Sequence, residues 1–187
     1  MACQEHCNEY GRVAAVAQAP AIPNGNDFMQ MSAQETEREL AFIIITHGDI
    51  GESLLAVAEY ILGRKLANFV AVKVPFMGEL HHVMDSNCPS PFAERRRLIR
   101  EQIRQAKKQV DRGGGIIVLA DLLGGTGFTV ASECLTADQG VIIAGVNLPM
   151  LLKAAEVKQG SPVAVAVDLV ERSRKAVVYR AAPSLPE

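Results

Sequence analysis

The sequence predicts a single-domain α/β protein with an open, mostly parallel sheet and helices on both of its faces. Three short apolar runs, within residues 41–46, 116–121 and 141–146, are rich in β-branched residues, as strands buried on both faces are. Helical periodicity or a glycine-rich turn follows each run. Strands joined by helices pair in parallel through right-handed crossovers, so we expect one parallel sheet.

Composition excludes several classes of function. The chain has 187 residues and a formal net charge of −2, so it has no excess of Lys and Arg to neutralise a nucleic acid. No apolar run approaches the roughly 20 residues that cross a bilayer, and no stretch resembles a signal peptide. We therefore expect a cytoplasmic protein with no nucleic-acid partner and no membrane insertion.

The first part of the chain differs from the rest. Residues 1–38 have no sustained hydrophobic period and are expected to be a disordered tail before a domain at residues 39–182. The tail holds Cys3, His6 and Cys7, but structural zinc sites usually have four ligands, so we expect no metal. The four cysteines are few and irregularly spaced, which argues against a disulfide scaffold.

The first strand ends in a motif of chemical interest. Residues Ala41–Ile45 lead into Thr46-His47-Gly48, so the imidazole should lie at the C-terminal tip of a central strand. A helical pattern follows and ends near Gly63, a suitable residue after a helix C-terminus. In open α/β sheets this strand-to-helix edge binds ligands, and helix N-termini favour anions. The alternative is that His47 only satisfies a carbonyl group in a tight turn.

The next segments are an edge strand, an irregular stretch and a long helix. Residues 68–74 alternate as a strand near the sheet edge would, and residues 76–91 are expected to be irregular, with His81 and His82 on a solvated loop. A helix is expected over residues 92–112. Its many Arg and Lys residues indicate a solvated face rather than a docking surface.

A second buried strand, Ile116–Asp121, ends in a carboxylate. A glycine-rich turn, residues 122–128, then opens another helix. The third strand covers residues 141–147, and its last residue, Asn147, can cap the following helix. The C-terminal part is ambiguous, since Ser161-Pro162 indicates a helix start while the following valines alternate as in a strand. We favour a helix there, with a short extended segment at residues 175–180.

These strand ends bring His47, Asp121 and Asn147 to one edge of the sheet. A carboxylate beside an imidazole fixes its tautomer and leaves the other ring nitrogen as a nucleophile. The glycine-rich turn and the helix starts supply N–H donors for an anion. The turn is neither a Walker motif nor a dinucleotide-binding fingerprint, so we expect no cofactor.

Three blocks in this chain resemble a known family. Ile-Ile-Thr-His-Gly, Leu-Ala-Asp-Leu-Leu-Gly-Gly-Thr and Ile-Ala-Gly-Val-Asn-Leu-Pro-Met occur in order, and the likeness covers about residues 40–180. They resemble the enzyme IIA domain of the mannose family of the bacterial phosphoenolpyruvate-dependent sugar phosphotransferase system. The resemblance implies a protein-to-protein phosphotransferase in which His47 accepts a phosphoryl group from the phosphocarrier HPr and passes it to a IIB domain for sugar uptake.

The resemblance also implies roles for other residues. Asp121 would pair with His47, Thr126 would place a hydroxyl near the phosphate, and a homodimer would form in which a C-terminal extended segment is exchanged. Main-chain N–H groups of the turn and of the first helix start would stabilise the phosphoryl group. These expected phosphate-binding residues are Gly48, Gly124, Gly125 and Thr126, with Thr46 and Asn147 as support.

The chain also departs from the family pattern. Gly127 and Thr129 stand where family members commonly have Pro and Asn, and we expect Gly127 to loosen the loop. One alternative function is a regulatory sensor that uses the same histidine to report the phosphorylation state of the system to a non-transport partner. Another is a module that binds phosphate esters without transfer chemistry.

Overall fold

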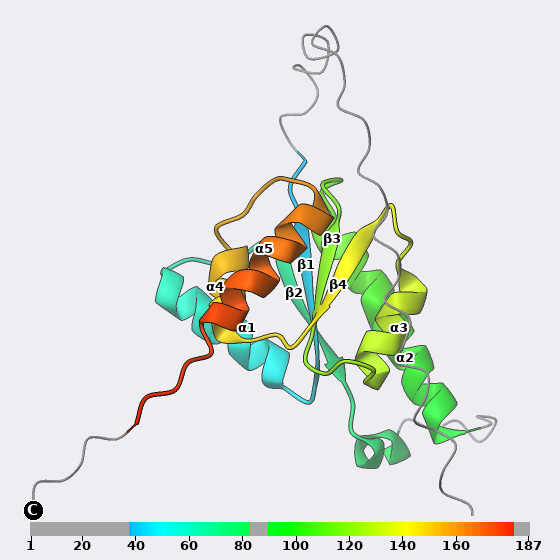
Figure 1. The fold of residues 1–187 in the computed structure, drawn as a ribbon. Coiled ribbons are helices and arrows are strands. Elements are labelled where there is room, and N and C mark those ends of the chain that lie inside the picture. Colours follow the sequence, from blue (N-terminus) through cyan, green and yellow to red (C-terminus); the bar gives the residue numbers. More distant parts are fainter. Residues whose placement is uncertain (1–37, 83–89, 182–187) are drawn as a thin grey trace, which may run out of the picture. The chain divides into compact units, whose positions relative to one another are not determined.

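The computed structural model describes residues 38–82 and 90–181. Its centre is a four-stranded, all-parallel sheet in the order β2-β1-β3-β4 (Figure 1), which confirms the predicted open sheet and the edge position of the second strand. The strands are β1 (Ala41–His47), β2 (Phe69–Val74), β3 (Ile116–Ala120) and β4 (Gly140–Ala144). The predicted tail, apart from its last residue, lies outside the described residues, as do Cys3, His6 and Cys7.

Helices cover both faces of the sheet, as predicted. One face packs against α1, α4 and α5, and the other packs against α2 and α3 (Figure 1). The helices are α1 (Ile50–Leu62), α2 (Pro91–Val110), α3 (Thr126–Cys134), α4 (Leu148–Ala154) and α5 (Pro162–Lys175), and a short 3₁₀ helix, η2 (Met77–His82), lies between β2 and α2.

The alternation of side chains along β1 divides the core in two. Phe42 and Ile44 join the cluster under α1, α4 and α5, while Ile43 and Ile45 join the cluster under α2 and α3. All four are fully buried, which accounts for an apolar run without polar alternation. Because successive side chains of a strand point to opposite faces, His47 belongs to the α2 and α3 face.

An aromatic pair supports the pairing of β1 with β2. Phe42 lies opposite Phe69 in the parallel register, and their rings stack with centroids 4.5 Å apart and planes 14° apart. Such a pair contributes about 0.5–1.5 kcal/mol beyond the area that it buries. This contact helps to fix the register that places His47 opposite Val74 at the end of the sheet.

Several local predictions are confirmed. Gly63 follows α1 with a positive φ of 63° and donates its N–H to carbonyl groups of the last helical turn. Asn147 caps α4 by accepting the Met150 N–H at 3.0 Å. The C-terminal ambiguity is resolved in favour of the helix, because α5 begins at Pro162.

Two expectations need correction. The segment from residue 76 was expected to be irregular, but η2 forms there. The Glu79 side chain accepts the Phe76 N–H, and the Glu79 backbone N–H donates to the Phe76 carbonyl group. The third strand was expected to reach Asn147 but ends at Ala144, since Gly145 takes a φ of 89°.

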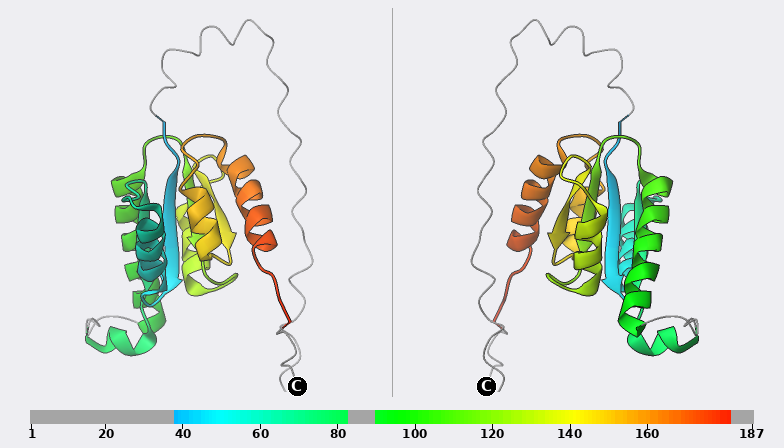
Figure 2. Two further views of the ribbon diagram at one scale, coloured as in Figure 1. Left: turned by 90° about the vertical axis from the view of Figure 1, so that its left-hand side faces the viewer. Right: turned by 90° about the vertical axis from the view of Figure 1, so that its right-hand side faces the viewer.

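The chain after α5 is extended but unpaired in the described structure. Residues 177–181 belong to no helix or strand, and this red segment leads away from α5 in both views of Figure 2. Val177, Val178 and Tyr179 are 78%, 84% and 96% exposed.

The close approach of β3 and β4 predicts a sensitive glycine. A Cβ at Gly140 would lie 2.1 Å from the Ile116 carbonyl oxygen, which belongs to the paired backbone. We expect Gly140→Ala to lower the free energy of unfolding by about 1–3 kcal/mol, the usual cost of overpacking. Urea unfolding measures this, with Gly78→Ala as the control because a Cβ there meets nothing within 4 Å. Equal stabilities of the two variants would contradict the prediction.

Candidate functional site

His47 is the last residue of β1, and its side chain is 28% exposed. Strand β1 is central, so the residues that follow β3 are its neighbours at the C-terminal edge of the sheet. In the register Ile45 lies opposite Ala120, and Asp121 comes directly after β3. The predicted pair His47 and Asp121 is therefore brought together by strand order and register.

One carboxylate oxygen of Asp121 makes two contacts with His47. Oδ2 accepts the His47 backbone N–H at 2.8 Å and lies 2.9 Å from the ring atom Nδ1. An ionised carboxylate can only accept hydrogen bonds, so the contact places the ring proton on Nδ1. This tautomer leaves the lone pair of Nε2 for reaction or for a ligand.

The environment of Asp121 favours its charged form. Partial burial acts to raise the pKa of this carboxyl group, but hydrogen bonds from the His47 backbone and ring, with a further one from the Leu122 backbone, outweigh burial and lower the pKa. The side chain is 22% exposed. The carboxylate is therefore ionised at neutral pH and fixed in position beside the imidazole.

The glycine-rich turn lies next to the imidazole. Gly124 has a φ of 73°, a conformation that residues with a Cβ rarely adopt. At Gly125 a Cβ would lie 3.5 Å from His47 Cε1, the ring atom between the two nitrogens. The backbone of Gly125 thus approaches the ring closely, and α3 begins at the next residue.

The N-terminus of α3 presents free donors beside this ring. Gly125 has no side chain to cap the helix, and the N–H groups of Thr126, Gly127 and Phe128 have no hydrogen-bond partner among the described residues. Unpaired N–H groups and the positive end of the helix dipole together favour an anion. The sequence indicated Thr126, whereas the donors of Gly127 and Phe128 follow only from where the helix starts.

Gly127 has a different role from the expected one. We predicted that it loosens the loop, but it is buried within the first turn of α3. A Cβ there would lie 2.8 Å from Val74 Cγ2 and 3.1 Å from Ile45 Cγ1. The glycine instead allows α3 to pack closely against β1 and β2.

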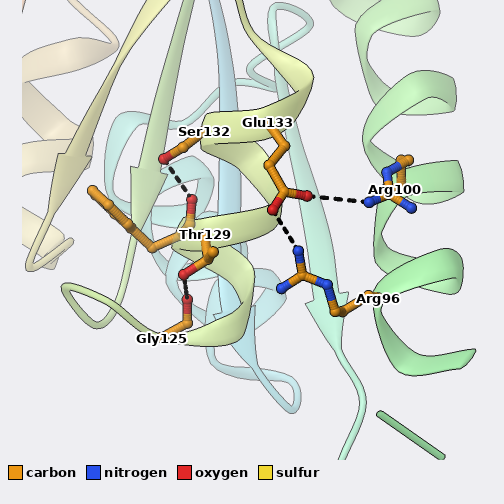
Figure 3. Close-up of polar contacts among 7 residues, drawn as sticks. Arg96, Arg100, Gly125, Thr129, Ser132 and Glu133 are labelled. Atoms are coloured by element: carbon orange, nitrogen blue, oxygen red, sulfur yellow. Dashed lines mark hydrogen bonds and ion pairs between the residues drawn. The ribbon is translucent and has the colours of Figure 1, made fainter. Parts of the chain in front are cut away.

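Polar contacts hold α3 in place (Figure 3). Glu133 near its C-terminal end forms ion pairs with Arg96 and Arg100 of α2, the second at 3.1 Å. Hydrogen bonds from Arg96, and then from Arg100, lower the pKa of Glu133. At the other end, Thr129 Oγ1 donates to the Gly125 carbonyl group at 3.0 Å. Part of the basic face of α2 therefore serves to orient the helix that supplies the free donors.

Thr46 and Gly48 hold the turn on either side of His47. Thr46 is buried, and its Oγ1 accepts the Gly51 N–H at 2.7 Å, so it caps α1 in place of Asp49, whose side chain makes no capping bond. The Gly48 N–H donates to the Val74 carbonyl group at 3.2 Å, which engages a donor that was expected to face the phosphate. Gly48 instead shapes the turn after His47, because it takes a positive φ of 55°.

The remaining predicted residues are Asn147 and the pair His81 and His82. The side chain of Asn147 is used locally, because it caps α4 and its Nδ2 donates to the Gly145 carbonyl group at 3.2 Å. His81 and His82 end η2 instead of lying on the expected irregular loop.

Among the described residues no group of three or more metal-ligating side chains is placed to hold a metal ion. No helix in the described ranges is long and apolar enough to cross a membrane.

Cavity size alone does not identify this site. A cavity of ≈ 730 Å³, lined by Lys107, Asp111 and Gln139 among others, lies around the C-terminal end of α2 and the start of β3, whereas His47 lies at the end of β1. A mostly apolar groove of ≈ 510 Å³ lies between α1 and the start of α4, and Asp49, Ile50 and Leu148 line part of it. We base the assignment on the paired side chains and free donors, because these have specific chemistry.

Comparisons with known proteins point to one group. Residues 93–171 match the family model described as the fructose IIA component of the phosphotransferase system, a range that includes Asp121 and begins after His47. The chain is 30% identical over 155 residues to the mannose-specific EIIAB component of the phosphotransferase system from Escherichia coli strain K12. That alignment covers 78% of this chain and 43% of the relative, so the chain spans less than half of the relative's length.

Solved structures agree with this likeness. The mannose/sorbose-specific IIA subunit from Enterococcus faecalis is 25% identical, with a TM-score of 0.60 over 79% of this chain and 99% of that chain. The EIIA component from Streptococcus agalactiae is 23% identical, with a TM-score of 0.56 over 75% of this chain and 96% of that chain, and supports the fold.

The lowered pKa of Asp121 predicts a pH dependence. A carboxyl group whose folded pKa is below its unfolded value of about 4 stabilises the fold above that pH, and this stabilisation is lost as the pH falls through the folded pKa. We expect the difference in free energy of unfolding between the wild type and Asp121→Asn to be largest near neutral pH and to shrink below about pH 4. Urea unfolding across this range measures it. A difference independent of pH would contradict the prediction.

Proposed function

Because this chain belongs to the mannose family of IIA components of the phosphoenolpyruvate-dependent sugar phosphotransferase system, we propose that it is a phosphocarrier. His47 accepts a phosphoryl group from HPr and passes it to a IIB domain or protein for sugar uptake. The observation that carries this proposal is the contact of Asp121 with His47 Nδ1 at 2.9 Å, which leaves Nε2 as the nucleophile. No cofactor takes part, because the phosphoryl group moves directly between proteins.

The transfer is a displacement at phosphorus. The Nε2 lone pair forms a new P–N bond while the P–N bond of the donor phosphohistidine breaks, and that bonding pair returns to the donor ring. The Nδ1 proton remains in place, so the His47 ring becomes cationic and the Asp121 carboxylate stabilises it. The reverse movement delivers the phosphoryl group to IIB.

The start of α3 stabilises the charge that develops during transfer. In the loose transition state of phosphoryl transfer, negative charge spreads over three equatorial oxygens. The N–H groups of Thr126, Gly127 and Phe128, which have no hydrogen-bond partner among the described residues, are fixed donors at the helix start that follows Gly125. Preorganised donors of this kind stabilise a transition state without reorganising. Thr126 adds a hydroxyl group at the same helix start.

The surface around His47 suits protein partners. Ile50, Leu122 and Leu123 are 52%, 58% and 65% exposed, and they flank the two strand ends that carry His47 and Asp121. Ile50 also lines the apolar groove of ≈ 510 Å³. Exposed apolar residues that are grouped in this way are typical of interaction sites. They support transfer between proteins rather than to a small molecule.

We also propose a homodimer. The outer side of β4 pairs with no strand among the described residues, and all of its residues except Ile143 are only half-buried. The exposed, β-branched Val177 and Val178 with Tyr179 form an extended segment with no partner strand in the described ranges. An open strand edge and an apolar strand-forming segment complement each other, so each copy would supply this segment to the sheet of the other.

The first test is the site of labelling. With phosphoenolpyruvate, enzyme I and HPr, we expect one acid-labile, base-stable phosphate per chain, at His47. His47→Ala should take up none while remaining folded by circular dichroism, and a variant with His81→Ala and His82→Ala should label normally. Mass spectrometry at neutral pH locates the group. Label that persists in His47→Ala would overturn the assignment.

The second test is the role of Asp121. We expect Asp121→Asn to slow phosphoryl transfer strongly, because an amide stabilises the cationic ring poorly and its NH₂ group favours the wrong tautomer. The analogous change in a serine protease slows catalysis about ten-thousand-fold, which serves as an upper guide. Rapid-quench transfer from phosphorylated HPr measures the rate, with the exposed Asp138→Asn as the control. A wild-type rate for Asp121→Asn would show that its carboxylate is only structural.

A further inference from the structure

Phe76 covers the backbone next to His47. Gly48 is buried although the residue after it is exposed, and a Cβ at Gly48 would lie 2.8 Å from Phe76 Cε2 and 3.0 Å from Cζ. The edge of the ring therefore rests against the Gly48 backbone. Phe76 is nevertheless 54% exposed, so much of the residue meets solvent beside the candidate site.

Reciprocal hydrogen bonds hold the Phe76 backbone. Its N–H donates to Glu79 Oε2 at 3.0 Å, and its carbonyl group accepts the Glu79 N–H at 3.0 Å. These bonds begin η2 and fix the direction in which the chain leaves β2. The position of the ring is thus set by a structured turn rather than by a free loop.

Lys73 connects this turn to the residue after Gly48. Its Nζ lies 3.2 Å from Glu79 Oε1 and 3.1 Å from Asp49 Oδ1. Hydrogen bonds to Asp49, and then to Glu79, raise the pKa of Lys73 above its ordinary value. Asp49, Lys73, Glu79, Phe76 and Gly48 form a closed chain of contacts that ties the His47 turn to η2.

We propose that Phe76 forms the wall of the phosphorylation site on the β2 side and slows hydrolysis of the phosphohistidine, with Lys73 as the residue that positions it. This inference rests on the proposed function. In hydrolysis a water oxygen attacks phosphorus, the P–Nε2 bond breaks with its electron pair returning to the ring, and inorganic phosphate leaves. An apolar ring beside the site offers no hydrogen bond to an attacking water and occupies one side of its approach.

A carrier has a particular need for such a wall. Its phosphoryl group must survive between encounters with two proteins, while the site has to stay open enough for both to reach Nε2. The side chain of His47 is 28% exposed, so water reaches it in the absence of a partner. Fixing an exposed phenyl ring against Gly48 removes one direction of attack without closing the site.

The test follows the loss of phosphate in the absence of partners. The full chain and its variants are loaded from radiolabelled phosphoenolpyruvate, freed of enzyme I and HPr by gel filtration, and sampled at pH 7.5 for acid-labile phosphate. We expect Phe76→Ala to lose label several-fold faster than the wild type, and Phe76→Leu to resemble the wild type. Lys73→Met should fall between them, while Lys108→Met, a change at an exposed lysine near the C-terminal end of α2, should match the wild type.

The possible results separate the inference about Phe76 from the proposed function. Equal half-lives of label in Phe76→Ala and the wild type would overturn the inference, whereas a wild type that takes up no label at His47 would overturn the proposed function instead. If Phe76→Ala does not fold, Lys73→Met against Lys108→Met decides in its place. All half-lives are measured where circular dichroism shows the variants folded, so a purely structural role would leave them unchanged.

Discussion

The double contact of Asp121 Oδ2 with His47 is the interaction on which the site depends. The same oxygen accepts a backbone N–H and holds a ring nitrogen, so it joins the ends of β1 and β3 and fixes the imidazole in one step. This geometry requires the register in which Ile45 faces Ala120. A slip of one residue would turn His47 to the opposite face of the sheet, away from α3. The stacking of Phe42 on Phe69 and the fully buried core around β1 therefore also maintain the register on which the contact of His47 with Asp121 depends.

Close backbone approach is the second constraint, and it explains why glycines gather at this edge. Gly125 brings the turn against His47 Cε1, and Gly127 brings α3 against Ile45 and Val74. A Cβ at Gly127 would overlap Val74 and move the helix start, and with it the free donors, away from the ring, whereas a Cβ at Gly125 would lie in contact with the imidazole. The ion pairs of Glu133 with Arg96 and Arg100 resist the same movement from the far end of α3. The glycines allow the approach, and the ion pairs maintain it.

Much of the fold and the main pair of the site could be predicted from the sequence because they follow from short-range patterns. The apolar run of β1, the glycine after α1 and the Asn147 cap each depend on a few neighbouring residues. Strand order then brought His47 and Asp121 together without any knowledge of side-chain geometry. What the sequence could not reveal depends on tertiary contacts. The engagement of the Gly48 N–H and the packing role of Gly127 both involve Val74, which is distant in sequence from both glycines.

The position of Asp121 also answers an electrostatic difficulty in the proposed mechanism. A carboxylate near a phosphoryl group repels it, yet the cationic ring formed during transfer needs a negative partner. Binding Nδ1 places the carboxylate on the side of the ring away from Nε2, so the positive ring lies between the two negative groups. In that mechanism the start of α3 would meet the phosphoryl oxygens with N–H donors, which carry no counter-charge that would have to be desolvated. Separate partners for the two ring nitrogens let one histidine be stabilised as a cation while it carries an anion, and this arrangement suits a group that must both accept and release phosphate.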